Sequence, residues 1–216
     1  MNQSLIDGLD YLAHNGLNLA AIMSTDDLPS EIVDRLAAHD IDVRGYRRLV
    51  LLGHGGRRLW EALSTSDITG DHPIDRYSAR LATTFIADYL PNAAWQLLFP
   101  SSLPLDLQHL GTLAGWSHPS PLGTGIHRQF GVWFAYRAAF LIDADLPVLR
   151  QVPGEAPCSA CVTRDCISAC PSQATGYPDQ FDVFTCATFR VQPASPCVDR
   201  CLARLACPYA PQHRYS

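Results

Sequence analysis

Eight cysteines, all between Cys158 and Cys207, constrain this 216-residue chain more than any other feature. Four of them lie in the stretch Cys158-Ser-Ala-Cys161-Val-Thr-Arg-Asp-Cys166-Ile-Ser-Ala-Cys170-Pro171, which has the spacing C-x2-C-x4-C-x3-C-P. The other four are Cys186, Cys197, Cys201 and Cys207. The surrounding segment contains few aliphatic residues, so we expect it to depend for its folding on a bound metal or on the domain that precedes it.

The spacing is close to the C-x2-C-x2-C-x3-C-P pattern of bacterial ferredoxins, in which the cysteine before proline binds the other of two clusters. Applied to this chain, that rule gives a first set of ligands and a second set. The first is Cys158, Cys161, Cys166 and Cys207, and the second is Cys170, Cys186, Cys197 and Cys201. We therefore predict one or two [4Fe-4S] clusters. Two alternatives stay open, a four-thiolate structural zinc site and a disulfide framework.

Composition and charge narrow the class of protein. The chain is 47% hydrophobic and 17% charged, as in ordinary globular proteins, and its net charge of −5 gives no reason to expect a nucleic-acid partner. The N-terminus has no signal-peptide pattern, and the uncharged stretch 107–127 is broken by Gly, Ser and Pro. We expect a cytoplasmic protein with no membrane partner, where clustered thiols bind metals more often than they form disulfides.

The sequence predicts an α/β scaffold domain over residues 1–147, a Pro- and Gly-containing linker over 148–157, and a cysteine-rich module over 158–216 that ends in an exposed tail at 212–216. Helices are expected at 4–14, 26–38, 57–63, 73–89 and 107–116, and strands at 17–23, 49–52, 95–99, 124–127 and 132–142. Asp26 or Asp27 is the expected N-cap of the second helix, with Ile32, Leu36 and Ala37 facing inward, and Asp71 is the expected N-cap of the longest helix.

The most apolar predicted strand carries an arginine. Alternation along 132–142 places Trp133 and Arg137 on one face of the strand. A buried guanidinium requires a partner, which is either an Asp of a neighbouring element or an anionic cofactor or substrate. His127 either contacts a ligand or is a hydrogen-bonded residue that lines the core. His127, Trp133 and Arg137 are thus the candidate cofactor-binding residues, and the sequence indicates no catalytic residue.

The segment from Gly125 to Arg137 resembles the His-Pro-Arg-Phe-Gly-Gly-Trp-Phe-Ala-x-Arg segment of the cobalamin-processing CblC proteins. His72-Pro-Ile-Asp-Arg76 is similar to the Asp-Pro-Val-Asp helix start of that family. Arg128, Gln129 and Val132 replace the Pro, Arg and second Gly of the CblC pattern.

The order of the parts resembles the epoxyqueuosine reductases. Leu113-Ala-Gly-Trp116 is similar to their Ala-Gly-Leu-Gly-Trp segment, Asp143-Ala-Asp-Leu-Pro147 to their Asp-x-x-Leu-Pro sequence, and a double [4Fe-4S] module then follows. Both families have a scaffold related to flavin nitroreductases, an α/β sandwich with a largely antiparallel sheet. The proton-donating Asp of the epoxyqueuosine reductases lies in an Asp-Ser-Ala-Pro segment that is absent from this chain, so epoxyqueuosine is not the expected substrate.

The resemblance implies an iron-sulfur redox protein. Single electrons would pass from [4Fe-4S] clusters to a corrinoid, or alternatively to FMN, bound on the N-terminal domain beside His127, Trp133 and Arg137. Such a protein would be a cobalamin-dependent reductase or a cobalamin-processing protein, supplied by an electron donor such as a flavodoxin or ferredoxin reductase. The alternatives are a ferredoxin-like electron carrier without substrate chemistry and a zinc-stapled interaction module.

Overall fold

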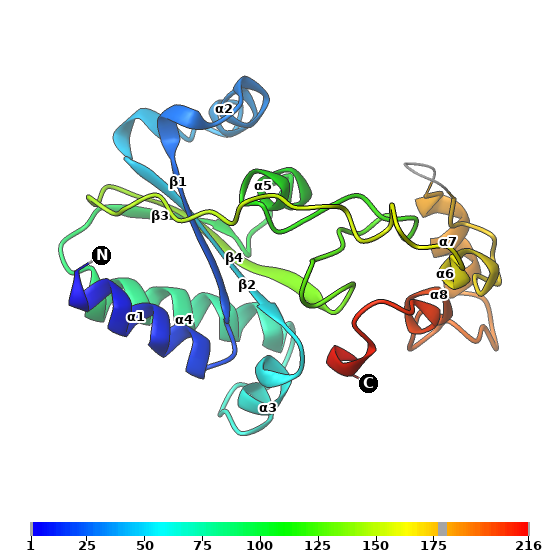
Figure 1. Cartoon of the computed structure of the whole chain (residues 1–216). Coiled ribbons are helices and arrows are strands. Elements are labelled where there is room, and N and C mark those ends of the chain that lie inside the picture. The colour runs from blue at the N-terminus through cyan, green and yellow to red at the C-terminus, as the bar shows by residue number, and fades with distance from the viewer. Residues whose placement is uncertain (1, 177–180, 216) are drawn as a thin grey trace. The chain divides into compact units, whose positions relative to one another are not determined.

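The computed structural model describes residues 2–176 and 181–215 and divides the chain into two compact units (Figure 1). The sheet unit comprises Met1–Gly115 and Ala135–Val152, and the thiol unit comprises Trp116–Phe134 and Pro153–Ser216. The division at 152/153 falls inside the expected linker. Residues 116–134, however, group with the cysteine-rich part, because Leu122, Ile126, Val132 and Trp133 pack with its cysteines in one apolar cluster.

A four-stranded sheet with strand order β1-β2-β4-β3 forms the centre of the sheet unit. Its strands are β1 (Leu19–Ser24), β2 (Arg48–Gly55), β3 (Trp95–Phe99) and β4 (Phe134–Ile142). β1 pairs antiparallel with β2, with Leu19 opposite Gly53, and β3 pairs antiparallel with β4, with Trp95 opposite Ile142. The predicted α/β fold with a largely antiparallel sheet is confirmed.

Amphipathic helices cover this sheet. On one face lie α1 (Gln3–His14) and α4 (Pro73–Tyr89), whose apolar positions recur at helical spacing and pack on strand residues such as Leu52 and Phe140 (Figure 1). The helices approach closely at Gly8, where a side chain would collide with the Phe85 ring. In Figure 1, α2 (Ser30–Ala37) and α5 (Leu107–Leu113) lie on the other side of the sheet, and α3 (Arg58–Ser64) follows β2.

Two of the expected helix N-caps are wrong. Asp26 and Asp27 lie in a separate 3-10 turn, Thr25–Asp27, and α2 begins only after Pro29. α4 begins after His72, whose left-handed backbone (φ 51°) occupies the cap position in place of Asp71. Ile32 and Leu36 are buried as expected, whereas Ala37 is exposed.

The expected strand at 124–127 is wrong. The described residues there form only isolated bridges, His118 with Ile126 and His127 with Gly131. A tight turn at Gly131, which has a φ of 60°, brings the chain back on itself. Trp133 therefore precedes β4, which starts at Phe134, and does not share a strand face with Arg137.

The thiol unit has short helices joined by turns: α6 (Asp165–Ser168), α7 (Val183–Arg190), α8 (Leu202–Ala206) and a 3-10 turn at Pro211–His213. Cysteine side chains take the place of aliphatic ones in its core. Cys166, Cys170 and Cys207 are buried there beside Ala174 and Ala203. Across the described ranges 2–176 and 181–215, no helix is both long and apolar enough to cross a membrane.

Candidate metal and cofactor site

All eight cysteines lie in the thiol unit and are free thiols. Their side chains fall into two groups, and within each group the thiols influence one another's ionisation. In the first group, burial, followed by the negative charge of Cys207, Cys166 and Cys161, raises the pKa of Cys158 to about 11. Burial, then Cys207 and Cys161, likewise raises the pKa of Cys166. Cys158, Cys161, Cys166 and Cys207, called below the first thiol set, are therefore neighbours in space.

The second thiol set is Cys170, Cys186, Cys197 and Cys201. All four line one cavity, with Leu122, Phe181 and Phe189 among its apolar walls. Burial and then the neighbouring charges of Cys201 and Cys170 raise the pKa of Cys186. The cysteines thus lie in the same two groups of four that the ferredoxin rule gave, and their binding of metal stays a prediction. Among the described residues, no three His, Cys, Asp or Glu side chains are grouped closely enough to hold a single metal ion.

Cys170, the residue before Pro171, differs from its neighbours in its hydrogen bonds. Burial raises its pKa, but the Ser172 hydroxyl, followed by nearby polar groups of Ala174 and Thr175, lowers it, and the pKa lies below the ordinary value as a result. The Sγ–Oγ distance to Ser172 is 3.4 Å. Donors directed at this sulfur favour the thiolate, which is the form that binds metal.

His127 is 2% exposed, and its hydrogen bonds define its tautomer. Its Nδ1 accepts the backbone N–H groups of Gln129 at 3.0 Å and Phe130 at 3.3 Å, so the ring proton of the neutral form sits on Nε2. Burial, then the nearby positive charges of His118, Arg128 and His213, lowers its pKa to about 4. The buried Nε2 has no hydrogen-bond partner among the residues that the structure describes. His127 is therefore a neutral N–H donor with unused capacity.

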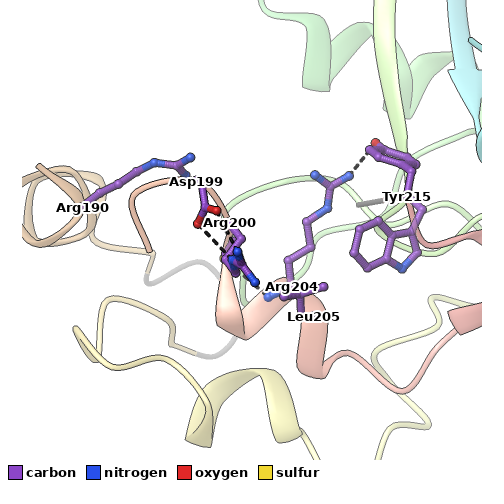
Figure 2. Close-up of a pocket in the computed structure, with 8 residues that line it drawn as sticks. Arg190, Asp199, Arg200, Arg204, Leu205 and Tyr215 are labelled. Carbon is purple, nitrogen blue, oxygen red and sulfur yellow. Dashed lines mark hydrogen bonds and ion pairs between the residues drawn. The ribbon is translucent and has the colours of Figure 1, made fainter. Parts of the chain in front are cut away.

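Trp133 is held within the thiol unit by Arg204 and Tyr215. The Arg204 guanidinium lies over its indole at 4.6 Å, and the Tyr215 ring meets it edge-on at a centroid distance of 5.4 Å. Figure 2 shows Arg204 and Tyr215 on one side of a pocket, with Arg190, Arg200 and Asp199 toward the other. Trp133 and Cys201 also line this pocket, so it adjoins the second thiol set.

Arg137 belongs to the sheet unit, whereas His127 and Trp133 belong to the thiol unit. Its Nε donates to His54 Nδ1 at 2.9 Å, and its side chain is half-buried. One partner that the structure shows is thus an imidazole from the end of β2, and the expected carboxylate or anionic ligand stays a prediction. His54 accepts at Nδ1 and carries its ring proton on Nε2 in the neutral form.

Sequence reasoning missed Arg204 and the C-terminal residues around it. The expectation of an exposed tail at 212–216 holds for Gln212 and is wrong for 213–215, because His213 packs against Phe130 at a ring distance of 4.8 Å and Tyr215 packs against Trp133. Ser216 lies outside the described residues. The aromatic rings at Tyr209 and Tyr215, close to several arginines, were the available signal, since exposed tails seldom carry such side chains.

The fold and the thiols together define the class: an α/β scaffold with a small unit that contains two groups of four cysteines. No protein-family profile matches the chain, and no curated protein matches it in sequence. Solved structures do match it. The epoxyqueuosine reductase of Bacillus subtilis superposes with a TM-score of 0.63 at 14% identity, and that of Streptococcus thermophilus with a TM-score of 0.60 at 12% identity. Each match covers 97% of this chain and 66% of the other.

A catabolic reductive dehalogenase, solved in complex with 3-bromo-4-hydroxybenzoic acid, also matches, with a TM-score of 0.61 at 15% identity over 90% of this chain and 30% of the other. The chain therefore spans just under two thirds of the reductases and under a third of the dehalogenase. At these identities the likeness is one of fold. It supports the resemblance to epoxyqueuosine reductases and gives no support to the resemblance to CblC.

Proposed function

We propose that this chain is an iron-sulfur protein of the corrinoid-linked reductase type. It would hold a [4Fe-4S] cluster on each thiol set and deliver single electrons to a corrinoid. The observation that carries the proposal is the grouping of eight free thiols into two sets of four. The fold shared with an epoxyqueuosine reductase and a reductive dehalogenase adds to it, because both names denote reductive chemistry.

The donor set fits iron and sulfur. Clusters of this kind are held by four cysteine thiolates, and each set here offers four thiols. Hydrogen bonds to the sulfurs tune the potential of such a centre, and the Ser172 hydroxyl lies within hydrogen-bond distance of the Cys170 sulfur. When bound, the clusters and the corrinoid supply one-electron chemistry at neutral pH. The apolar walls of the cavity that holds the second thiol set, including Leu122 and Phe189, would limit the access of water to its sulfurs.

His127 fits a neutral organic ligand better than a metal ion. Its Nδ1 lone pair is occupied by two backbone N–H groups, and its Nε2 carries a proton, so neither nitrogen is available to coordinate a metal. The Nε2–H can donate to an amide or carboxylate oxygen, such as those on the side chains of a corrinoid. We therefore assign His127 the role of hydrogen-bond donor to the ligand. Trp133 supports the part of the chain next to His127. Arg137 holds the orientation of His54 through its hydrogen bond to that ring.

The test is metal and acid-labile sulfide analysis with a visible spectrum, on protein purified without oxygen and then titrated with hydroxocobalamin. About eight irons and eight sulfides per chain, the content of two cubanes, with a saturable spectral change on addition of cobalamin, would support the proposal. A His127→Ala variant should keep its iron and lose affinity for cobalamin. His14→Ala is a matched control on the exposed end of α1 and should change neither property.

The other outcomes separate the alternatives. Clusters without any response to cobalamin would make the chain an electron carrier. Zinc without sulfide would overturn the proposal and make the thiol unit a metal-stapled interaction module.

A further inference from the structure

The outer face of α7 is apolar although it faces solvent. Phe184, Ala187, Thr188 and Val191 follow one another at the i, i+3, i+4, i+7 spacing of a single helix face, and all four are exposed. Phe184 and Val191 are each 81% exposed, and no residue of the helix is buried. An amphipathic helix normally turns its apolar stripe inward, so an outward stripe marks a contact surface.

The inner face of the same helix carries one member of the second thiol set, Cys186. Cys186 and Phe189 line the cavity that contains its four thiols. An α-helix with its side chains is about 10 Å across, so a protein seated on the outer face of α7 would lie roughly one helix diameter from these thiols. Cys186, Cys197 and Cys201 are half-exposed, whereas two members of the first set, Cys166 and Cys207, are buried. The second set is therefore the more accessible one.

Arginines border this face. The side chain of Arg190, the last residue of α7, makes no hydrogen bond or salt bridge with another described residue. It lines the pocket of Figure 2 together with Asp199, Arg200 and Arg204. The sheet unit has ten arginines against sixteen acidic residues, whereas the thiol unit has six against five. The thiol unit thus has a net charge of +1 and the sheet unit a net charge of −6, so the excess of negative charge on the chain lies in the sheet unit.

We propose that the outer face of α7, bordered by Arg190 and Arg200, is the docking surface for an acidic electron-donor protein that carries a one-electron centre. The proposal rests on the proposed function, in which the second thiol set holds a cluster. One electron leaves the donor and enters that cluster, and no bond or proton changes. Redox encounters use small interfaces, and complementary charge increases their rate of association. The short apolar stripe on α7 is a small interface, and the arginines at its border are complementary in charge to an acidic partner.

The binding test uses the anaerobically purified holoprotein and an oxidised, acidic flavodoxin as the probe, with the affinity measured by calorimetry at low ionic strength. We expect Val191→Glu and Arg190→Glu each to weaken binding about tenfold or more through like-charge repulsion, with the difference shrinking at high salt. Val152→Glu and Arg44→Glu are the matched controls, since Val152 is 83% exposed and Arg44 is exposed, and both lie in the sheet unit. They should bind within twofold of the unchanged protein.

The iron content and the extent of reduction by dithionite are measured on every variant. Full iron and complete reduction in all of them, with flavodoxin binding lost only in the α7 variants, would support the docking surface. Equal binding by Val191→Glu and Val152→Glu, or no binding by the unchanged protein, would overturn it. So would a dimer that Val191→Glu converts to a monomer, since a second copy would then occupy the face. A chain without iron would instead overturn the proposed function.

Discussion

The guanidinium of Arg204 lies over the indole ring of Trp133, with 4.6 Å between its central carbon and the ring centroid. The same group donates two hydrogen bonds to the Val132 carbonyl, at 3.0 Å from Nε and 2.6 Å from Nη2, and one to the Tyr215 hydroxyl at 2.8 Å. Arg204 belongs to α8, whose N-cap is Cys201. It therefore joins the helix beside the second thiol set to the turn that follows His127.

Replacement of Arg204 by alanine should destabilise the thiol unit. Charge-assisted hydrogen bonds and the cation–π contact would be lost together, and we expect a cost of about 2–4 kcal/mol in the free energy of unfolding. Urea unfolding of anaerobically prepared protein measures the difference. Arg200→Ala is the matched control, because the only ion pair of Arg200 among the described residues is with its surface neighbour Asp199, and it should leave the unfolding midpoint unchanged. Equal midpoints for the two variants would contradict the assigned role of Arg204.

Single replacements in the two thiol sets should remove the clusters separately. Cys161→Ser and Cys201→Ser each remove one ligand from a different set, so each should lower the iron content by about half, from roughly eight to four. The double variant should contain almost none. A serine hydroxyl can still cap α8, as the Cys201 sulfur does when it accepts the Arg204 N–H, so the effect would report ligation and not capping. Full iron in either single variant would refute the ligand assignment.

Much of this arrangement could be predicted from the sequence, where local patterns decide the structure. The strands 17–23, 49–52 and 95–99 and the helix at 4–14 occur as β1, β2, β3 and α1 with small shifts of their ends, because periodicity and strong apolar runs specify them. The two thiol sets are predicted from the spacing of the cysteines together with the ferredoxin rule for the cysteine before proline. The order of the parts indicates the fold that the structural matches share.

The rest depends on contacts distant in sequence. The apolar residues of the segment 116–134 are typical of a scaffold strand, but Ile126 and Trp133 are buried in the cysteine-rich core, which a local pattern does not reveal. His54 and Arg137 lie 83 positions apart, so nothing near either residue indicates the pairing. The expected caps at 71 and 26–27 are wrong because the backbone turns next to the prolines at 73 and 29 decide where those helices begin.

His127 should stay neutral across the physiological range. Its pKa of about 4 in the folded chain lies below the ordinary value of 6.5, so between these two values the unfolded chain binds more protons than the folded one. The contribution of the neutral ring to stability is therefore complete above about pH 6.5 and is lost as the pH falls toward 4, with a total of about 3 kcal/mol.

Nitrogen-15 NMR of histidine-labelled protein measures this directly. Between pH 5 and 8 the His127 signals should not shift, with the proton on Nε2 and the lone pair on Nδ1. A titration with a midpoint between 6 and 7, or a proton on Nδ1, would show that the two backbone N–H groups do not hold the ring as described.

Gly115 should tolerate no side chain, because two independent constraints act at this position. Its φ of 76° lies in the left-handed region, which costs an alanine about 1–2 kcal/mol. A Cβ there would also collide with the backbone carbonyl of Gln151, where the returning chain donates its N–H to the Ala114 carbonyl at 3.0 Å. Since backbone cannot rotate away as a side chain can, Gly115→Ala should lower the free energy of unfolding by more than about 2 kcal/mol.

Gly45→Ala is the matched control for this replacement, because no atom lies within 4 Å of the position that its new methyl group would occupy. The control should be neutral or stabilising by up to about 1 kcal/mol, since alanine restricts the unfolded chain more than glycine does. Urea unfolding of the two variants side by side measures the difference. A Gly115→Ala protein as stable as Gly45→Ala would mean that the segment around Gln151 does not pass against Gly115 in solution.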